Sequence, residues 1–298
     1  MDPCNVKIPA LMDLTDENIT ANTVIVNSQG PDARLQYLME RLVTHLHDFA
    51  RETQLTTDEW MKALAFLKDA GQISSDTRQE FILLSDVLGL SSLVESINSP
   101  KPANATEGSV LGPFHTNNAQ FTENGDSIAS PDKGEPCLVR CTLEDTSGHP
   151  IPDATINVWE ADNTGRYDTQ YEGETGPDCR GILKSNKDGE FWFKCVKPVP
   201  YPIPHDGPVG KLLGTLRRHP FRPAHLHFMI EREGALYLRG DPYETSDAVF
   251  GVKSSLLVTP HKVQDPDIAE RYSVSVDDWD IQWGFVLVGE AEGRQSKE

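Results

Sequence analysis

The chain has 298 residues, which is enough for one large domain or two smaller ones, each with its own apolar core. Hydrophobic residues make up 38% of it and charged residues 24%, a composition typical of a globular protein in water. The formal net charge of −19 argues against a nucleic-acid partner, because lysine and arginine supply most of the affinity for a phosphate backbone.

Helical periodicity dominates the first hundred residues. One stripe of apolar residues predicts an amphipathic helix; its members are Leu35, Leu38, Leu42, Leu46 and Phe49. An apolar stripe of this kind usually forms part of a core or of a subunit interface.

Three further helices and a linker are expected after this one. Thr56 and Glu59 have the spacing of a capping box, and the apolar stripe that follows them ends before Gly71. Asp76 is expected to cap the third helix, which ends before Gly89. A short fourth helix over residues 93–97 and a linker over residues 99–104 complete this part of the chain.

After the linker the apolar period changes to two residues, which is typical of strands. Five strands are expected, over residues 138–143, 155–159, 190–195, 225–230 and 285–288. No helical period alternates with them, so an antiparallel sandwich is favoured over a parallel sheet. The sequence therefore predicts an α+β fold, with an N-terminal helical domain over residues 1–100 and a β-sandwich domain over residues 101–298.

Compartment is predicted from the cysteines and the apolar runs. The five cysteines are scattered and fit neither a zinc knuckle nor a disulfide framework, so we interpret them as reduced thiols. No apolar run reaches the length of a membrane helix, and the N-terminus lacks the features of a signal peptide. We expect a cytoplasmic protein without a membrane span.

His225 and His227 are the first candidates for a metal site. In a strand, residues two apart point to the same face, so both imidazoles could reach one ion. Pro223 favours an extended conformation for Arg222, which would place the arginine near the same site. The alternative to metal binding is that the two histidines have a structural role or are exposed to solvent.

Tyr167 and Tyr201 are the second pair of candidates. Most tyrosines in β-proteins pack the ring and hydrogen-bond the hydroxyl, but Tyr201 lies in a proline-rich loop that can hold a side chain in place. A phenolate is a hard anionic oxygen ligand, and beside two imidazoles it favours a high-charge ion. Ferric iron would then be the natural occupant, and the chemistry would involve oxygen and phenols.

A cupin-type Fe(II) enzyme is an alternative for the same histidines. The spacing of His225, His227 and Glu231 matches the first motif of a cupin. A second cupin motif is missing, because His261 has no preceding glycine pattern and Asp265 stands where an asparagine is expected. A noncatalytic β-sandwich binding module, in which these residues are merely packed, is the third possibility.

Several longer motifs in the same order make the chain resemble the intradiol ring-cleaving dioxygenases, and among them the hydroxyquinol-cleaving members. The motifs are Leu111-Gly112-Pro113-Phe114-His115, Val158-Trp159-Glu160-Ala161 with Gly165-Arg166-Tyr167, the loop from Tyr201 to Gly210, Arg222-Pro223-Ala224-His225-Leu226-His227, and the segments 241–243 and 246–253. The resemblance runs from about the first helix to the last strand.

The resemblance implies one non-haem ferric ion per chain. Tyr167 and His225 would be equatorial ligands, and Tyr201 and His227 axial ligands. Tyr201 would also take a proton from the substrate, and Arg222 would stabilise negative charge on it. The reaction implied is insertion of O2 between two adjacent hydroxyl-bearing ring carbons, which gives a dicarboxylate.

The substrate preference implied is for hydroxyquinol (benzene-1,2,4-triol), giving 3-hydroxy-cis,cis-muconate, the enol of maleylacetate. Asp86 could accept a hydrogen bond from the third hydroxyl. The pocket wall would consist of Leu83, Asp86, Leu111, Gly112, Pro113, Phe114, Ile203, Pro204 and Arg222. The alternative within the family is a catechol 1,2-dioxygenase giving cis,cis-muconate.

The resemblance also implies a homodimer formed through the N-terminal helices, with a phospholipid bound at the interface in many members of the family. One departure from the family pattern is the hairpin after His227, which is shorter than expected. A residue that lines the pocket in relatives could therefore be displaced, which affects the fine substrate preference and not the iron site.

Overall fold

The computed structural model describes residues 9–75, 78–98, 101–109, 112, 114–171, 173, 176–230, 233–238 and 252–289, the stretch 233–238 by its backbone alone. Contacts divide the chain into two compact units, Met1–Asp69 and Ala70–Glu298. The predicted domains, residues 1–100 and 101–298, stay a prediction. Asp76, the predicted cap of the third helix, lies outside the described residues.

The first unit is helical, as its apolar period predicts. It contains α1 (Ile19–Asn27), α2 (Ala33–Thr53) and most of α3 (Thr57–Ile73), and α1 packs along α2. Asp32 caps α2 by accepting hydrogen bonds from the backbone of Arg34 and Leu35. The capping box of α3 is confirmed, since Thr56 N donates to Glu59 Oε2 over 2.9 Å. The helix extends past Gly71, where its end was predicted, to Ile73.

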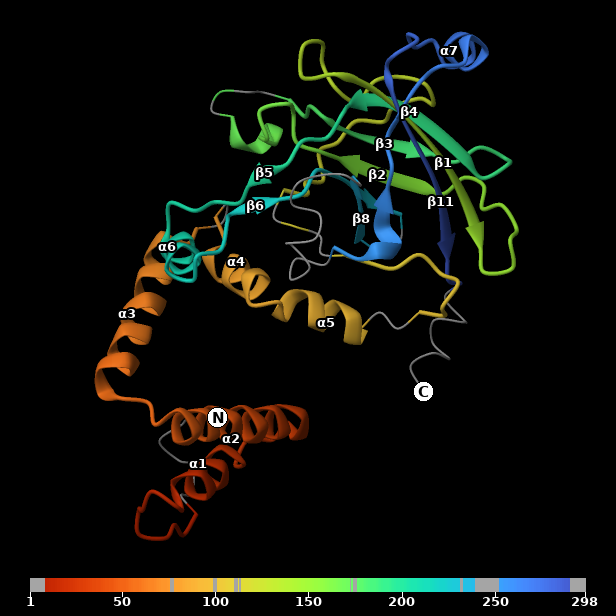
Figure 1. Cartoon of the computed structure of the whole chain (residues 1–298). Helices are drawn as coiled ribbons and strands as arrows, with labels where there is room; N and C mark the ends of the chain where they lie inside the picture. Colours follow the sequence, from red (N-terminus) through yellow and green to blue (C-terminus); the bar gives the residue numbers. More distant parts are fainter. Residues whose placement is uncertain are drawn as a thin grey trace. The chain divides into compact units, whose positions relative to one another are not determined.

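Two helices precede the sheets in the second unit. They are α4 (Glu80–Val87) and α5 (Leu90–Asn98), drawn in yellow-orange in Figure 1, and Gly89 between them has a positive φ of 76°. A helix that the apolar period did not predict, α6 (Pro208–Thr215), contacts α4. Among the described helices, none is both long enough and apolar enough to cross a membrane.

Two sheets pack face to face and form the predicted sandwich (Figure 1). The four-stranded sheet has the order β10-β11-β1-β4, with β1 Pro136–Asp145, β4 Glu190–Val196, β10 His261–Lys262 and β11 Trp279–Leu287. The five-stranded sheet has the order β3-β2-β7-β8-β9, with β2 Thr155–Trp159, β3 Arg180–Lys184, β7 His225–Met229, β8 Glu233–Leu238 and β9 Leu257–Val258. A separate short ribbon pairs β5 (Tyr201–Pro202) with β6 (Phe221–Arg222).

The fold class is confirmed, with one refinement of the strand directions. Most ladders are antiparallel, but β1 runs parallel to β11 and β8 runs parallel to β9. Apolar alternation identifies a strand and its buried face, but it carries no information on the partner or the direction of pairing. The parallel β1–β11 pair joins the first and last strands of the sandwich, which are more than one hundred residues apart.

The sandwich core determines which side chains remain on the outer face. Leu226 and Phe228 of β7 point into the core, together with Ile156 and Val158 of β2. Because successive residues of a strand alternate between faces, the other residues of β7 and β2 point away from the core. His225, His227 and Trp159 therefore lie on the outer face of the five-stranded sheet.

Candidate metal centre and active site

His225 and His227 lie next to each other on the outer face of β7 and are 2% and 1% exposed. Their Nε2 atoms face each other at 3.1 Å. Two nitrogens that bind one ion at the usual distance of about 2.1 Å, at roughly a right angle, would be about 3 Å apart. The histidine pair therefore has the separation of two adjacent ligands.

The tautomer of His225 follows from its other ring nitrogen. Nδ1 lies 2.7 Å from the carbonyl oxygen of Pro223, so it must carry the proton and donate it. The lone pair is then on Nε2, which faces His227. A backbone carbonyl that orients a ligating imidazole in this way is typical of metal sites.

Two buried tyrosines complete the cluster. Tyr167 is fully buried and Tyr201 is 3% exposed, and their rings meet edge to face with centroids 5.4 Å apart. The Tyr201 ring lies 5.4 Å from that of His225, and the Tyr167 ring lies 6.4 Å from that of His227. The four predicted ligands, which come from three separate segments, are therefore neighbours in one small volume.

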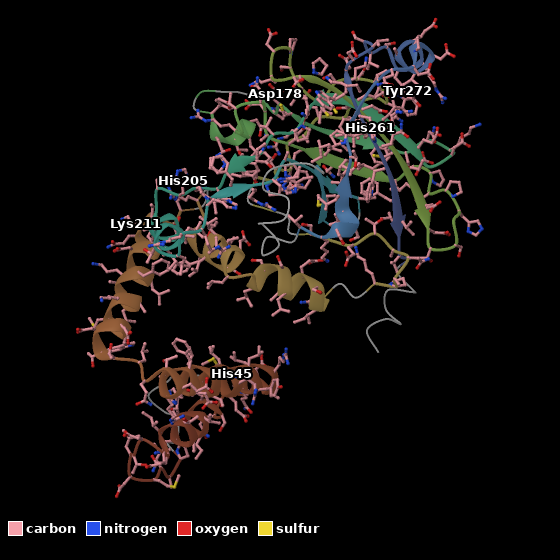
Figure 2. The ribbon with its side chains drawn as sticks, in the orientation of Figure 1. His45, Asp178, His205, Lys211, His261 and Tyr272 are labelled. Atoms are coloured by element: carbon pink, nitrogen blue, oxygen red, sulfur yellow. The ribbon has the colours of Figure 1, made fainter. Side chains whose placement is uncertain are left out.

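Local backbone features hold the tyrosine segments close. Gly165 has a φ of +75°, and a Cβ there would approach the Cβ of Tyr201 to 2.9 Å. A side chain at residue 165 would therefore push the two tyrosine segments apart. Beyond Tyr201, Ile203 N donates to Pro220 O over 2.9 Å, and His205 (labelled in Figure 2) lies 3.0 Å through Nδ1 from Ile203 O.

Burial keeps both imidazoles neutral, the form that binds metals. Burial, with the positive charge of Arg222, lowers the pKa of His225 to about 3. The pKa of His227 is lowered well below its usual range by burial first and then by electrostatic interaction with the adjacent His225. Arg222 is itself 3% exposed and pairs backbone to backbone with Tyr201 in the β5–β6 ribbon.

The donor groups fit a hard cation of high charge. Burial, followed by the nearby Tyr201, raises the pKa of Tyr167 well above its usual range, so a cation is needed to make it a phenolate. Among the described residues, no group makes a hydrogen bond of normal geometry to the Tyr167 hydroxyl, which leaves its oxygen available as a ligand. Within the described residues, no group of three or more His, Cys, Asp or Glu side chains could hold a metal, so the phenols are essential to this donor set.

The predicted pocket wall is described for most of its members. Leu83 and Asp86 of α4 are each 9% exposed, and Ile203 is 4% exposed. Burial raises the pKa of Asp86, and the nearby Arg222 and Ser91 offset this only in part. Leu111 and Pro113 lie outside the described residues, while Pro204 follows Ile203 and is half-buried.

Two wall residues contact the cluster directly. The Phe114 ring stacks on Tyr167, with centroids 4.3 Å apart and planes 16° from parallel. Gly112 has a φ of +74°, and a Cβ there would lie 3.6 Å from Nε2 of His227. Gly112 and Phe114 thus lie against one side of the cluster.

Some neighbours of the site were not singled out from the sequence. Trp159 stacks on His227, with ring centroids 4.8 Å apart and planes 4° from parallel. His115 meets the Trp159 ring edge to face, with centroids 5.0 Å apart. Trp159 alternates with the core residue Val158 on a predicted strand, so its outward direction was available from the period. Arg180 and Asp168 form a buried pair behind Tyr167, for which the sequence carries no local signal.

Family models match nearly the whole chain. A model described as the catechol dioxygenase N terminus matches residues 32–106, and a model described as a dioxygenase matches residues 110–289. Among curated proteins, an intradiol ring-cleavage dioxygenase of Aspergillus niger is 59% identical over 100% of this chain and 94% of its own length. A hydroxyquinol 1,2-dioxygenase of Rhizobium sp. is 44% identical over 91% of this chain and 95% of its own.

A solved structure agrees with both the fold and the relatives. The hydroxyquinol 1,2-dioxygenase of Pseudomonas putida DLL-E4 superposes with a TM-score of 0.86 at 38% identity. The match covers 92% of this chain and 99% of the other.

Proposed function

Because the chain belongs to the intradiol ring-cleavage dioxygenases, we propose that it cleaves hydroxyquinol with O2 at a non-haem Fe(III) site. The product would be 3-hydroxy-cis,cis-muconate, the enol of maleylacetate. The observation that carries the proposal is the convergence of two phenols and two imidazoles in one buried cluster beside Arg222. Membership of this family excludes the cupin-type enzyme and the noncatalytic module considered for the sequence.

Four side chains would hold one ferric ion per chain: Tyr167, Tyr201, His225 and His227. When bound, ferric iron acts as a Lewis acid toward the diol and accepts electron density from it. As the resemblance to the family implies, Tyr201 would take one proton from the substrate, and its backbone pairs with that of Arg222. Arg222 is buried and permanently charged, so it would stabilise the negative charge that develops on the ring oxygens.

Preference for hydroxyquinol would come from Asp86 in α4. This carboxylate is buried, and its charge interacts with that of Arg222, which supports a place at the substrate pocket. It could accept a hydrogen bond from the third hydroxyl, which catechol lacks. A hydrogen bond to a charged group contributes about 1.5–3 kcal/mol, equivalent to roughly 10- to 100-fold in preference.

Parallel turnover of hydroxyquinol and catechol tests this proposal. The iron-loaded protein is titrated anaerobically with each diol, and the products formed after admission of O2 are identified by mass spectrometry. We expect ring-opened dicarboxylates and a higher kcat/KM for hydroxyquinol. A higher kcat/KM for catechol, with cis,cis-muconate as product, would contradict the substrate assignment and leave the cleavage reaction intact.

The same family membership supports a homodimer through the N-terminal helices, with a bound phospholipid. The apolar stripe of α2 is largely exposed in the single chain, with Leu35, Leu42, Leu46 and Phe49 each more than half exposed. A second surface or a lipid chain would remove this area from water. Sedimentation and lipid extraction of the purified protein test both proposals.

A cytoplasmic location is also proposed. It is supported by four buried cysteines that form no disulfide, Cys137, Cys141, Cys179 and Cys195. Fractionation of the producing cells would test it.

A further inference from the structure

The buried side chain of Arg180 links Asp168, which follows Tyr167 in the sequence, to the backbone of Phe114, whose ring stacks on Tyr167. The side chain of Arg180, at the start of β3, is 2% exposed. Its Nε donates to Asp168 Oδ2 over 2.6 Å, and its Nη2 donates to the other oxygen of the same carboxylate. Its Nη1 donates to Phe114 O over 3.1 Å and to Thr116 Oγ1 over 2.9 Å. One guanidinium therefore joins three separate acceptor groups.

Two of these partners, Asp168 and Phe114, are connected directly to Tyr167. Asp168 follows Tyr167 directly and opens a 3₁₀ turn, Asp168–Gln170, whose last residue accepts a hydrogen bond from Tyr167 N over 2.9 Å. The carbonyl of Phe114 belongs to the residue whose ring stacks on Tyr167. Movement of the guanidinium would therefore change both the direction of the Tyr167 side chain and the ring that lies against it.

We propose that Arg180 is a positioning residue for Tyr167, acting through Asp168 on one side and through Phe114 on the other. The proposal rests on the function of Tyr167 as an iron ligand. Arg180 itself touches neither the metal donors nor the substrate in this proposal. Its role is to fix the angle of the phenol and the distance of the stacked ring.

The chemistry of the contacts requires arginine. A planar guanidinium can bind a carboxylate through two parallel hydrogen bonds and still donate from its third nitrogen. A lysine ammonium at this position could not span the carboxylate and the Phe114 carbonyl in the same geometry. A buried ion pair is weak evidence for stability in general, so its contacts on both sides of Tyr167 favour a positioning role.

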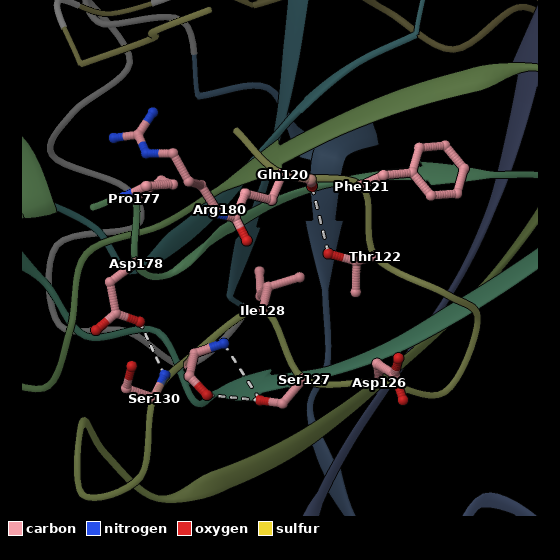
Figure 3. A pocket seen from close by; sticks show the side chains of 11 residues that line it. Gln120, Phe121, Thr122, Asp126, Ser127, Ile128, Ser130, Pro177, Asp178 and Arg180 are labelled. Carbon is pink, nitrogen blue, oxygen red and sulfur yellow. Dashed lines mark hydrogen bonds between the residues drawn. The ribbon is translucent and has the colours of Figure 1, made fainter. Parts of the chain in front are cut away.

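Arg180 also lines a neighbouring hollow at the surface, but its geometry does not favour a role in binding a ligand there. This hollow, of about 290 Å³, is lined by residues 120–122 and 126–130 and by Pro177, Asp178 and Arg180. Figure 3 shows the guanidinium of Arg180 pointing away from Asp126 and Ser127. Its hydrogen bonds are directed to Asp168, Phe114 and Thr116 instead.

The chain offers a matched control for substitution of this arginine. Arg140 of β1 also binds an aspartate through two nitrogens, with Nε donating to Asp280 Oδ1 over 3.0 Å. That pair links β1 to β11 in the other sheet, which contains neither Tyr167 nor Tyr201. Arg180→Lys and Arg140→Lys therefore remove comparable bidentate contacts, but only the first lies next to Tyr167.

The test measures two properties of the iron-loaded proteins besides turnover: the energy of the tyrosinate-to-iron absorption band and the rate of iron loss to a chelator. We expect Arg180→Lys to shift the band and to lose iron roughly 10-fold faster than the unsubstituted protein, as for other residues that orient metal ligands. Arg140→Lys is expected to leave both properties unchanged. Asp168→Asn, which keeps the shape of the side chain, should cause a smaller shift in the same direction.

The possible results separate this proposal from the proposed function. An unchanged band and iron-loss rate in Arg180→Lys, with a melting temperature lowered as in Arg140→Lys, would mean that the pair is only structural. If Arg180→Lys fails to fold, an unchanged band in Asp168→Asn has the same meaning. Absence of the band in the unsubstituted protein with full iron would instead overturn the proposed function.

Discussion

At the scale of single residues, the cluster combines groups whose roles differ although their burial is similar. The proton on Nδ1 of His225 is fixed by the Pro223 carbonyl, so its Nε2 can only be a lone-pair donor toward its neighbour. Within the part of the chain that the structure describes, the Tyr167 hydroxyl has no hydrogen-bond partner of normal geometry. The imidazole is thus oriented in advance, and the phenol oxygen is available to a ligand.

Tyr167→Phe should separate packing from iron binding. The ring is fully buried and stacked on Phe114, and the substitution keeps the ring, so the melting temperature of the iron-free protein should change little. Loss of the phenol oxygen should weaken or shift the visible absorption and lower kcat by about 100-fold or more. A variant with full activity and unchanged absorption would mean that Tyr167 is only a packing residue.

Asp86→Asn should change both substrate preference and the pH dependence of stability. The folded-state pKa of Asp86 is raised, so its ionisation opposes folding at pH values above the ordinary aspartate pKa of about 4. The stability of the unsubstituted protein, measured relative to the variant, should therefore fall as the pH rises from about 4 toward neutrality. Urea denaturation of both iron-free proteins at pH 3.5 and pH 7 measures this difference.

Turnover of hydroxyquinol and of catechol by Asp86→Asn tests the predicted change in substrate preference. Relative to the unsubstituted protein, Asp86→Asn should lose roughly 10- to 100-fold in its preference for hydroxyquinol over catechol. An unchanged preference would remove Asp86 from the substrate pocket. A stability difference that is the same at both pH values would show that Asp86 has an ordinary pKa in the folded protein.

How far the sequence predicts the site depends on how local each contact is. His225 and His227 are two residues apart on one strand, so alternation alone places them on one face. Tyr167 and Tyr201 were candidates because of the proline-rich loop and the chemistry of phenolates, but no periodicity places them beside the histidines, and their roles as ligands followed from the resemblance to the family. The pairing of Arg180 with Asp168, twelve residues away in the sequence, has no periodicity, and no sequence pattern predicts it.

At the scale of secondary-structure elements, β7 has two functions on its two faces. Leu226 and Phe228 anchor the strand in the sandwich core, and this anchoring holds the two histidines on the outer face. The strand and its faces were predictable, because the four residues from His225 to Phe228 alternate strictly between polar and apolar. Short elements such as β5 and β6, two residues each, were not predictable, because pairing over two residues leaves no period to detect.

Phe228→Ala should test the anchoring of β7. The ring is 2% exposed and packs within 5.0 Å of Phe285, so its removal should lower the free energy of unfolding by about 3–5 kcal/mol. Urea denaturation of the iron-free protein measures the change. Phe121→Ala is the control, since that ring is 56% exposed and its loss should matter by less than about 1 kcal/mol.

A second anchor joins α4 to the start of α6. Glu80 of α4 is 1% exposed, and its Oε1 accepts a hydrogen bond from Val209 N over 2.9 Å. Arg78 reaches the same carboxylate over 3.3 Å and binds Asp206 through two nitrogens at 2.9 Å each. These contacts connect the helix that carries Asp86 with the loop that follows Tyr201.

Glu80→Ala should therefore affect the site from a distance. A buried backbone N–H left without its acceptor lowers stability by about 1–3 kcal/mol, and the loop after Tyr201 loses a support. We expect a higher KM for hydroxyquinol with a smaller change in kcat. Glu80→Gln, which keeps the acceptor oxygen, is the matched control and should retain most of the stability; equal losses in the two variants would contradict the role of this hydrogen bond.

At the scale of the whole molecule, the strand order brings together the first and last strands of the sandwich. The first strand of the sandwich, β1, lies between β4 and β11, and β11 ends only at Leu287. The two sheets were predictable as a class, from strands without alternating helices. Their pairing order was not predictable, because it depends on contacts between residues far apart in the chain.

The visible absorption spectrum of the iron-loaded protein is the most direct test of the central claim, that two phenols and two imidazoles hold ferric iron for intradiol cleavage. The account predicts a coloured protein with one iron per chain, whose absorption changes when hydroxyquinol is added without oxygen. A protein that binds one iron per chain and remains colourless would contradict it, because no tyrosinate would then be bound to ferric iron.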